Sequence, residues 1–335
     1  MALIEVREKW LEQVQEEPLE PTRRIIDPHH HFFVASHEFP HYTLESLHRD
    51  TDTHKIRKTV YLQCWEGHRE DGPEHLKPVG ETEWVDGIAK EAAKSPDKAQ
   101  IGAMIGTADL RGRQVEEVLD AHLEASTLFR GIRQIAAWDA SPELFAMPDC
   151  SDPYLYRDPA FRAGFKALSD RGLVFDAYHY HTQAPFITEL AKAFPSTRIV
   201  IDHLGTPLGV GPYAGHVAGI YQQWASDLAE LAKCPNVYMK LGGLAMPWTG
   251  FDYAKFPRPP TSDQMVAEQG RHYHHAIAVF GPERCMFESN FPVDKCGVSY
   301  GVLWNAFKKI AATYSEADKD AMFYGTAALV YGIRD

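Results

Sequence analysis

Residues 24–33 read RIIDPHHHFF, an apolar run that carries one acid and three consecutive histidines. The isoleucines and phenylalanines predict a strand, and alternate side chains of a strand point to opposite faces. Asp27, His29 and His31 are therefore expected on one face, with His30 on the other. Two imidazoles side by side on a rigid element can bind one cation. Whether they do depends on what the rest of the chain brings to them.

Short apolar runs of this kind alternate with helical patterns along the whole chain. Such alternation is typical of a parallel sheet with helices outside it. Eight units in about 310 residues predict a (β/α)8 barrel, and no glycine-rich phosphate loop follows any run to favour an open doubly wound sheet. The runs are residues 24–33, 58–65, 99–110, 129–138, 173–181, 198–205, 237–244 and 285–293.

The expected domain organisation is a single barrel over residues 24–335, preceded by a helical extension over residues 1–23. The segment EVREKWLEQVQEEPLEP could pack across the base of the barrel or against a neighbouring subunit, so a homodimer is one expected assembly. A second histidine-rich stretch, RHYHHAIAVF at residues 271–280, has helical periodicity and is interpreted as an outer helix rather than a site.

Composition limits the classes of function. The net charge of −12 argues against a nucleic-acid partner or an anionic membrane surface, although arginines in a pocket could still bind an anionic substrate. Five scattered cysteines without CxxC spacing fit a reducing compartment. No signal peptide and no apolar stretch of roughly 20 residues is present. We therefore expect a soluble cytoplasmic protein that acts on a small molecule.

Polar residues gather where the predicted strands end, and a barrel carries its working groups at the carboxyl ends of its strands. Alternation places His179 with His181 on one face, and likewise Glu288 with Asn290. Trp65 is expected in a loop at the barrel mouth, where it could form one wall of the substrate site. The further candidates, in chain order, are His29, His31, Arg133, Gln134, Asp202, His203, Lys240 and Asp294.

Several of these residues have a structural and a functional interpretation. A single histidine at a strand end is more often a hydrogen-bonded core residue than a ligand. A His-x-His pair with further histidines on two other strands favours a metal, because neutral imidazole is a common zinc ligand. Arg133 could form an ion pair with Glu288 inside the barrel or anchor a substrate carboxylate. Lys240 is open to both interpretations as well.

Five blocks of this sequence, in order, resemble the amidohydrolase superfamily, in particular the metal-dependent hydrolases that include sugar lactonases and pyrone dicarboxylate lactonase. The resemblance implies a distorted (β/α)8 barrel with His29 and His31 as the first-strand pair. It also implies that His181, with His179 as competitor, is the fifth-strand histidine, and that His203 binds metal or polarises the substrate. The blocks are IIDPHHHF (25–32), RGIRQ (130–134), IDHLG (201–205), NVYMKLGGL (236–244) and MFESNFPVD (286–294).

Two departures from the superfamily pattern bear on mechanism. The fourth strand has no lysine to bridge two metals, so a binuclear centre is not expected. The aspartate that usually ends the eighth strand is Asn290 here, and an amide cannot act as a base at neutral pH. Either Glu288 or Asp294 accepts the proton instead, or a histidine does, or the reaction differs from ordinary hydrolysis. The missing carboxylate also weakens the case for a metal.

The leading hypothesis is a hydrolase that opens a lactone or related cyclic ester of a small, carboxylate-bearing molecule, or that cleaves an amide-like bond. One divalent metal, zinc first, is expected at His29, His31 and His181, where it would activate water. Two alternatives stay open: a metal-dependent non-oxidative decarboxylase of an aromatic or unsaturated acid, and a barrel that binds a small acid without turnover. The predicted catalytic residues are His203, Asn290, Asp294 and Glu288, and the predicted substrate contacts are Arg133, His179, Lys240 and Trp65.

Overall fold

Eight parallel strands form one sheet in chain order. The computed structural model describes residues 4–34, 38–144, 150 and 152–334. A parallel bridge between His30 and Phe291 connects the last strand's extension to the first strand, so the sheet is a nearly closed barrel and the predicted fold is confirmed. The strands are β1 Ile26–His30, β2 Lys58–Leu62, β3 Gln100–Gly106, β4 Phe129–Arg133, β5 Val174–Ala177, β6 Ile199–Ile201, β7 Val237–Leu241 and β8 Cys285–Phe287.

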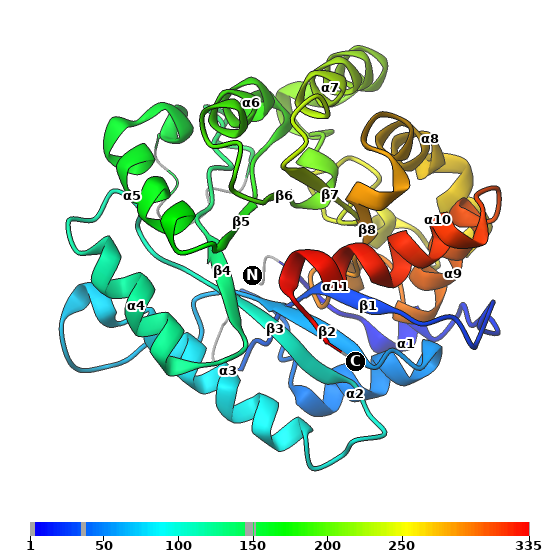
Figure 1. Cartoon of the computed structure of the whole chain (residues 1–335). Helices are drawn as coiled ribbons and strands as arrows, with labels where there is room; N and C mark the ends of the chain where they lie inside the picture. The colour runs from blue at the N-terminus through cyan, green and yellow to red at the C-terminus, as the bar shows by residue number, and fades with distance from the viewer. Residues whose placement is uncertain (1–3, 35–37, 145–149, 151, 335) are drawn as a thin grey trace.

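Helices surround the barrel, as Figure 1 shows. Local sequence sets where they begin: Asp158 accepts hydrogen bonds from the amides of Ala160 and Phe161, which caps the helix whose first residue is Pro159. The histidine-rich stretch at 271–280 lies on the predicted outer helix. The main helices are α2 Leu44–Thr51, α3 Val79–Ala92, α4 Val115–Ala125, α5 Pro159–Asp170, α6 Ala184–Ala193, α7 Val217–Leu231, α8 Ser262–Phe280 and α9 Tyr300–Ala311.

The strands are shorter than the apolar runs, so several candidate residues follow the strands instead of lying on them. β5 ends at Ala177 and β8 at Phe287. Strand alternation therefore does not set the directions of His179 and His181, or of Glu288 and Asn290, because these residues lie beyond the ends of β5 and β8. Asn290 even has a left-handed φ of 55°.

Alternation also fails on β1. The register of β1 against β2 shifts between Asp27 and His30, and the carboxylate of Asp27 accepts from the amide of Ser289 at 3.0 Å. Asp27 thus does not join the histidines on their face. His30 does point away from them, and its ring packs edge-on against Phe32 with 4.9 Å between centroids.

The end of the chain closes the barrel where the strands begin. After α10 (Glu316–Asp320) and a π-turn, η10 (Ala321–Gly325), comes α11 (Thr326–Tyr331), which lies against β1 and β8 in Figure 1. Arg130, at the start of β4, donates from Nε to the carbonyl of Tyr331 at 2.8 Å. The apolar side chains that form one cluster with those of α11 are Ile26, Val60, Leu62, Ala103, Ile105, Val174, Val200, Met286, Ala327, Val330, Tyr331 and Ile333. The polar site therefore lies at the opposite end.

The expected helical extension contains one α-helix within residues 4–23, α1 (Glu8–Leu11). The rest of this segment is irregular and packs against its own barrel. Trp10 Nε1 donates to the carbonyl of Phe256 at 3.2 Å, and the amide of Ser262 donates to Glu16 at 2.8 Å. Within the residues described, no helix has the length and apolar character needed to cross a membrane.

Candidate active site

The imidazoles of His29 and His31 face each other at the end of β1. Their Nε2 atoms are 3.1 Å apart, and both side chains are buried. His31 Nδ1 lies 2.8 Å from the carbonyl oxygen of Leu62, which can only accept, so Nδ1 carries the proton and Nε2 the lone pair. Burial lowers the pKa of His29 to about 4 and the pKa of His31 well below its ordinary value. Both rings are therefore neutral near pH 7.

The Nε2 atom of His29 carries a lone pair as well. Arg133 Nη1, which can only donate, lies 3.3 Å from this atom. On the other side of the ring, His29 Nδ1 is 2.8 Å from Glu288 Oε2. Lys240 Nζ is also 3.1 Å from Nδ1. A neutral imidazole whose Nε2 accepts from Arg133 carries its proton on Nδ1, so we place that proton on the side of Glu288. The Nε2 lone pairs of His29 and His31 are therefore both available to one bound cation.

The carboxylate of Glu288 also contacts His203. Its Oε1 accepts from the backbone amide of His203 at 3.0 Å and lies 2.7 Å from His203 Nδ1. Burial opposes ionisation, but His203 and His29 lower the pKa of Glu288 below its ordinary value. Glu288 is therefore an ionised residue that orients two histidines. His203 has a left-handed φ of 55°, a conformation that is uncommon outside glycine.

Lys240 lies beneath His29 in a column of buried charges. Its Nζ donates to Asp176 at 2.6 Å and to Asp202 at 3.0 Å, and the side chain is fully buried. The Tyr331 hydroxyl donates to Asp176 at 2.8 Å, which links the column to α11. Lys240, predicted as a substrate contact, is thus placed among these carboxylates and not in the pocket above them.

Arg133 forms its ion pair with Asp202, not with Glu288 as the structural interpretation of the sequence had it. Arg133 Nη1 lies 3.4 Å from Asp202 Oδ2, and Nη2 donates to the carbonyl of Gln63. The guanidinium also lines the pocket, beside His31 and His203. Its position therefore allows both a structural role and contact with a ligand.

Asn290 lines the pocket, and Asp294 lies behind it. Asn290 Nδ2 donates to Asp294 Oδ1 at 2.9 Å, which leaves the amide oxygen of Asn290 for the pocket. Asp294 Oδ2 accepts from the amide of Ala245 at 3.1 Å, and burial raises the pKa of Asp294 to about 7. Asparagine suits this position because it tolerates the left-handed backbone better than most residues. Asp294 therefore orients Asn290.

The two fifth-strand histidines lie apart from this group. His179 is fully buried, its ring is 6.0 Å from that of Tyr156, and its nitrogens have no hydrogen-bond partner among the described residues. His181 Nδ1 accepts from the amide of Leu208 at 3.3 Å, and its ring lies 5.3 Å from that of Tyr213. Neither lines the pocket, so a metal ligand at His181 stays a prediction.

The pocket itself is small, about 40 Å³, and its walls are largely aromatic. Trp65 lines it, as predicted, together with Tyr178 and Trp248. Sequence reasoning missed Tyr178 as a site residue, although it lies directly after β5 like the histidines that were chosen. The remaining lining residues are His31, Phe33, Phe39, Cys64, Arg133, Ile135, His203, Met246, Asn290 and Val293.

The donors present fit one cation. His29, Asp202 and His203 offer ligand atoms that all lie within 4.8 Å of one another, and His31 adds a second Nε2 beside that of His29. Lys240 Nζ already lies 3.1 Å from His29 Nδ1 and 3.0 Å from Asp202 Oδ1, so a metal would contact the Nε2 atoms of His29 and His31 instead. The surrounding buried column holds three carboxylates, Asp176, Asp202 and Glu288, against the two cations Lys240 and Arg133. The uncompensated negative charge favours a bound cation.

Comparisons with known proteins identify the family of this chain. The model of the amidohydrolase family matches residues 26–333. A protein of Sinorhizobium fredii called y4mH is 33% identical over 333 residues, 92% of this chain and 98% of that protein. An L-fucono-1,5-lactonase of Burkholderia multivorans is 29% identical over 238 residues, which cover 71% of this chain and 73% of the lactonase.

The fold also matches solved structures. The crystal structure of a Burkholderia multivorans amidohydrolase with bound zinc superposes with a TM-score of 0.73 at 23% identity, and the match covers 93% of this chain and 100% of that one. A family match over almost the entire barrel establishes membership independently of these individual relatives. The chain therefore belongs to the amidohydrolase family and is a hydrolase.

Proposed function

We propose that the protein opens a lactone, the cyclic ester of a small hydroxy acid, by attack of water on its carbonyl carbon. The observation that carries this proposal is the convergence of His29 and His31 Nε2 atoms, 3.1 Å apart, beside Arg133 and His203. The similarity to an L-fucono-1,5-lactonase supports an ester of a sugar acid as the first substrate class to test.

His29 and His31 would hold one divalent metal, zinc first, with His203 beside it as acid and base and not as a ligand. When bound, such a metal polarises a carbonyl and lowers the pKa of water. Arg133 contributes a guanidinium that stabilises negative charge as the acyl oxygen becomes part of a carboxylate. We therefore expect Arg133 to bind the carboxylate of the product or a second carboxylate of the substrate.

His203 is the proposed acid and base. Its Nδ1 is held by Glu288, as an imidazole is held by a carboxylate in catalytic triads, so its other nitrogen can take a proton from water and return it to the departing ring oxygen. The amide oxygen of Asn290 orients the water. Glu288 and Asp294, both candidates for proton acceptor, act in this proposal by positioning His203 and Asn290.

The test is acid release, followed by titration at constant pH, from a panel of five- and six-membered aldonolactones. We expect turnover of at least one, and a loss of about 10²–10⁴-fold in kcat for His203→Asn, the range that general acid–base groups contribute. His275→Asn, on the outer helix α8, is the matched control. Carbon dioxide release from aromatic acids without lactone opening would point to a decarboxylase. Thermal stabilisation by small acids without any turnover would point to a binding protein.

A further inference from the structure

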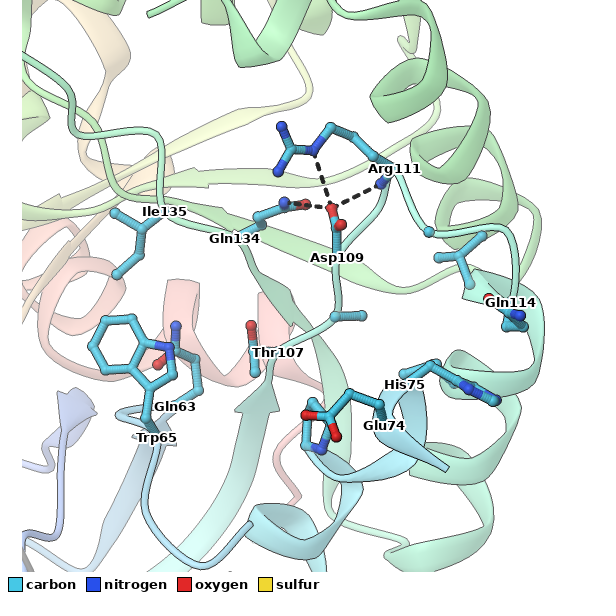
Figure 2. Close-up of a pocket in the computed structure, with 15 residues that line it drawn as sticks. Gln63, Trp65, Glu74, His75, Thr107, Asp109, Arg111, Gln114, Gln134 and Ile135 are labelled. Atoms are coloured by element: carbon cyan, nitrogen blue, oxygen red, sulfur yellow. Dashed lines mark hydrogen bonds and ion pairs between the residues drawn. The ribbon is translucent and has the colours of Figure 1, made fainter. Parts of the chain in front are cut away.

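A second hollow, of about 700 Å³, opens beside the pocket at the ends of β2, β3 and β4. The two cavities share Trp65 and Ile135 as lining residues, so these side chains lie at the boundary between them. In Figure 2, Gln63, Trp65 and Ile135 lie at one side of the hollow and Gln114 at the other. The volume of a ligand site is typically about 300–1,000 Å³. The hollow falls within this range, and the 40 Å³ pocket is much smaller. A ligand whose carbonyl is beside Arg133 therefore has room to extend here.

The charged side chains that line the hollow are paired. Asp109 accepts from Arg111 Nε at 3.3 Å and from Gln134 Nε2 at 3.0 Å, as the dashed lines in Figure 2 show. Glu74 forms an ion pair with Lys77 at 2.7 Å, and His75 Nε2 lies 2.9 Å from a carboxylate oxygen of Glu117. Since each charge already has a counterpart, the lining favours a neutral ligand over an ionic one.

Gln63 brings a polar group to the wall of the hollow. Its side chain is 1% exposed, and its Oε1 has no hydrogen-bond partner among the residues described. A buried acceptor without a partner is unfavourable, and it is usually met by a ligand or an ordered water. Two residues on, Trp65 has a left-handed φ of 64°, a strained backbone for a bulky residue that sets its indole at the boundary of both cavities.

We propose that this hollow is a subsite for a neutral, polyhydroxylated ring attached to the lactone, so that the substrate carries two rings rather than one. Ring hydroxyls both donate and accept, which matches Gln63 Oε1 together with the hydroxyl of Thr107 and the amide of Gln114. The apolar C–H face of such a ring packs against the indole of Trp65. The inference rests on the proposed lactonase function, and it specifies the substrate class.

The test compares kcat/KM for glucono-1,5-lactone and cellobiono-1,5-lactone, which differ by one glucosyl unit. We expect the wild type to prefer the two-ring lactone by about tenfold or more. Gln63→Leu removes the buried acceptor and Gln114→Trp fills the hollow from its exposed side, so each should lower this preference about tenfold, as expected for one lost hydrogen bond or a blocked ring. Gln223→Leu, on α7 and bound to Asp227, is the matched control and should leave the ratio unchanged.

The outcomes separate the subsite from the lactonase reaction. Hydrolysis of both lactones with a ratio that neither variant changes would overturn the subsite and leave the proposed function standing. If neither lactone is hydrolysed, binding of gluconate and cellobionate is measured by calorimetry. Cellobionate binding that is at least tenfold tighter than gluconate binding, and that both variants weaken, supports the subsite. Equal binding of the two acids, or no binding, overturns it.

Discussion

The carboxylate of Glu288 orients the rings of two of the site histidines. It lies 2.7 Å from His203 Nδ1 and 2.8 Å from His29 Nδ1, so the Nε2 atom of each ring is left for another partner. A neutral amide at this position could accept from one ring only and would supply no charge. Ligand orientation and site charge therefore both depend on a residue that does not line the pocket itself.

The first prediction concerns metal content. Protein purified without chelators should hold close to one divalent ion per chain, and His29→Ala combined with His31→Ala should abolish this binding. Glu288→Gln should weaken zinc affinity about 10–100-fold, as is usual when a group that orients a ligand is removed. Asn290→Asp should strengthen it, because a carboxylate adds charge beside the site.

Mass spectrometry of the purified proteins and zinc titration by calorimetry measure these quantities. Glu124→Gln, at an exposed position on α4, is the control for the loss of one carboxylate. Equal zinc content in the wild type and the double histidine variant would contradict the assignment. The histidines would then serve as a binding and proton-transfer cluster.

The second prediction concerns pH. Burial raises the pKa of Asp294 to about 7, above the value of an unfolded aspartate, so the folded protein holds its proton over a range where the unfolded chain has lost it. This contribution to stability is complete below pH of about 4 and is lost as pH rises to about 7. Asp294→Asn cannot lose a proton, so the variant should gain stability relative to the wild type between pH 5 and pH 8.

Urea unfolding at four pH values in this range gives the difference in free energy of unfolding. Only the pH dependence of this difference is interpreted. Its absolute size also reflects the replacement of a carboxyl oxygen by an amide NH₂ group near Asn290 and Ala245. Asp227→Asn, on the surface of α7, should show a constant difference. A constant difference for Asp294→Asn as well would mean that its carboxyl titrates normally in the folded protein.

At the scale of elements, periodicity was sufficient to predict eight strands, their order and the helices between them, but not where the strands end. β5 ends at Ala177, which pairs with Ile201 at the end of the neighbouring β6. Such an end depends on a neighbouring strand, and no local pattern contains it. Side-chain directions beyond it, as at His179 and His181, could therefore not be predicted from alternation.

The third prediction concerns α11, which anchors the charge column from below. Tyr331→Phe removes the hydroxyl that donates to Asp176 at 2.8 Å, and Asp176 then keeps only Lys240 as a donor among the described residues. We expect the free energy of unfolding to fall by about 1–3 kcal/mol, because the hydrogen bond is buried and its acceptor is a carboxylate. Urea unfolding measures the loss. Tyr154→Phe, on an exposed tyrosine, is the control, and an equally small effect for both would show that Asp176 does not need this bond.

At the scale of the whole molecule, the sequence was sufficient to predict which strands surround the site. It was not sufficient to predict which side chains line the pocket and which lie behind them. Arg133, His31, His203, Asn290 and Trp65 line the pocket. The predicted residues Glu288, Asp294 and Lys240 do not line the pocket and instead contact the side chains of residues around it. Glu288 and His203, for example, are 85 residues apart, and only the closed barrel brings them together.

The whole molecule also includes its N-terminal segment, whose contacts give the last prediction. Trp10, Leu11 and Val14 are buried against the same chain, each with less than a tenth of its surface exposed. A large apolar side chain contributes roughly 1.5–3 kcal/mol when fully buried, so deletion of residues 1–15 should lower the melting temperature by roughly 5–10 °C. Because these contacts are within one chain, light scattering should give the same oligomeric state for both proteins. If the truncated protein instead dissociates into smaller species and keeps its melting temperature, the segment belongs to a subunit interface. Only a contact between subunits would make assembly depend on these residues.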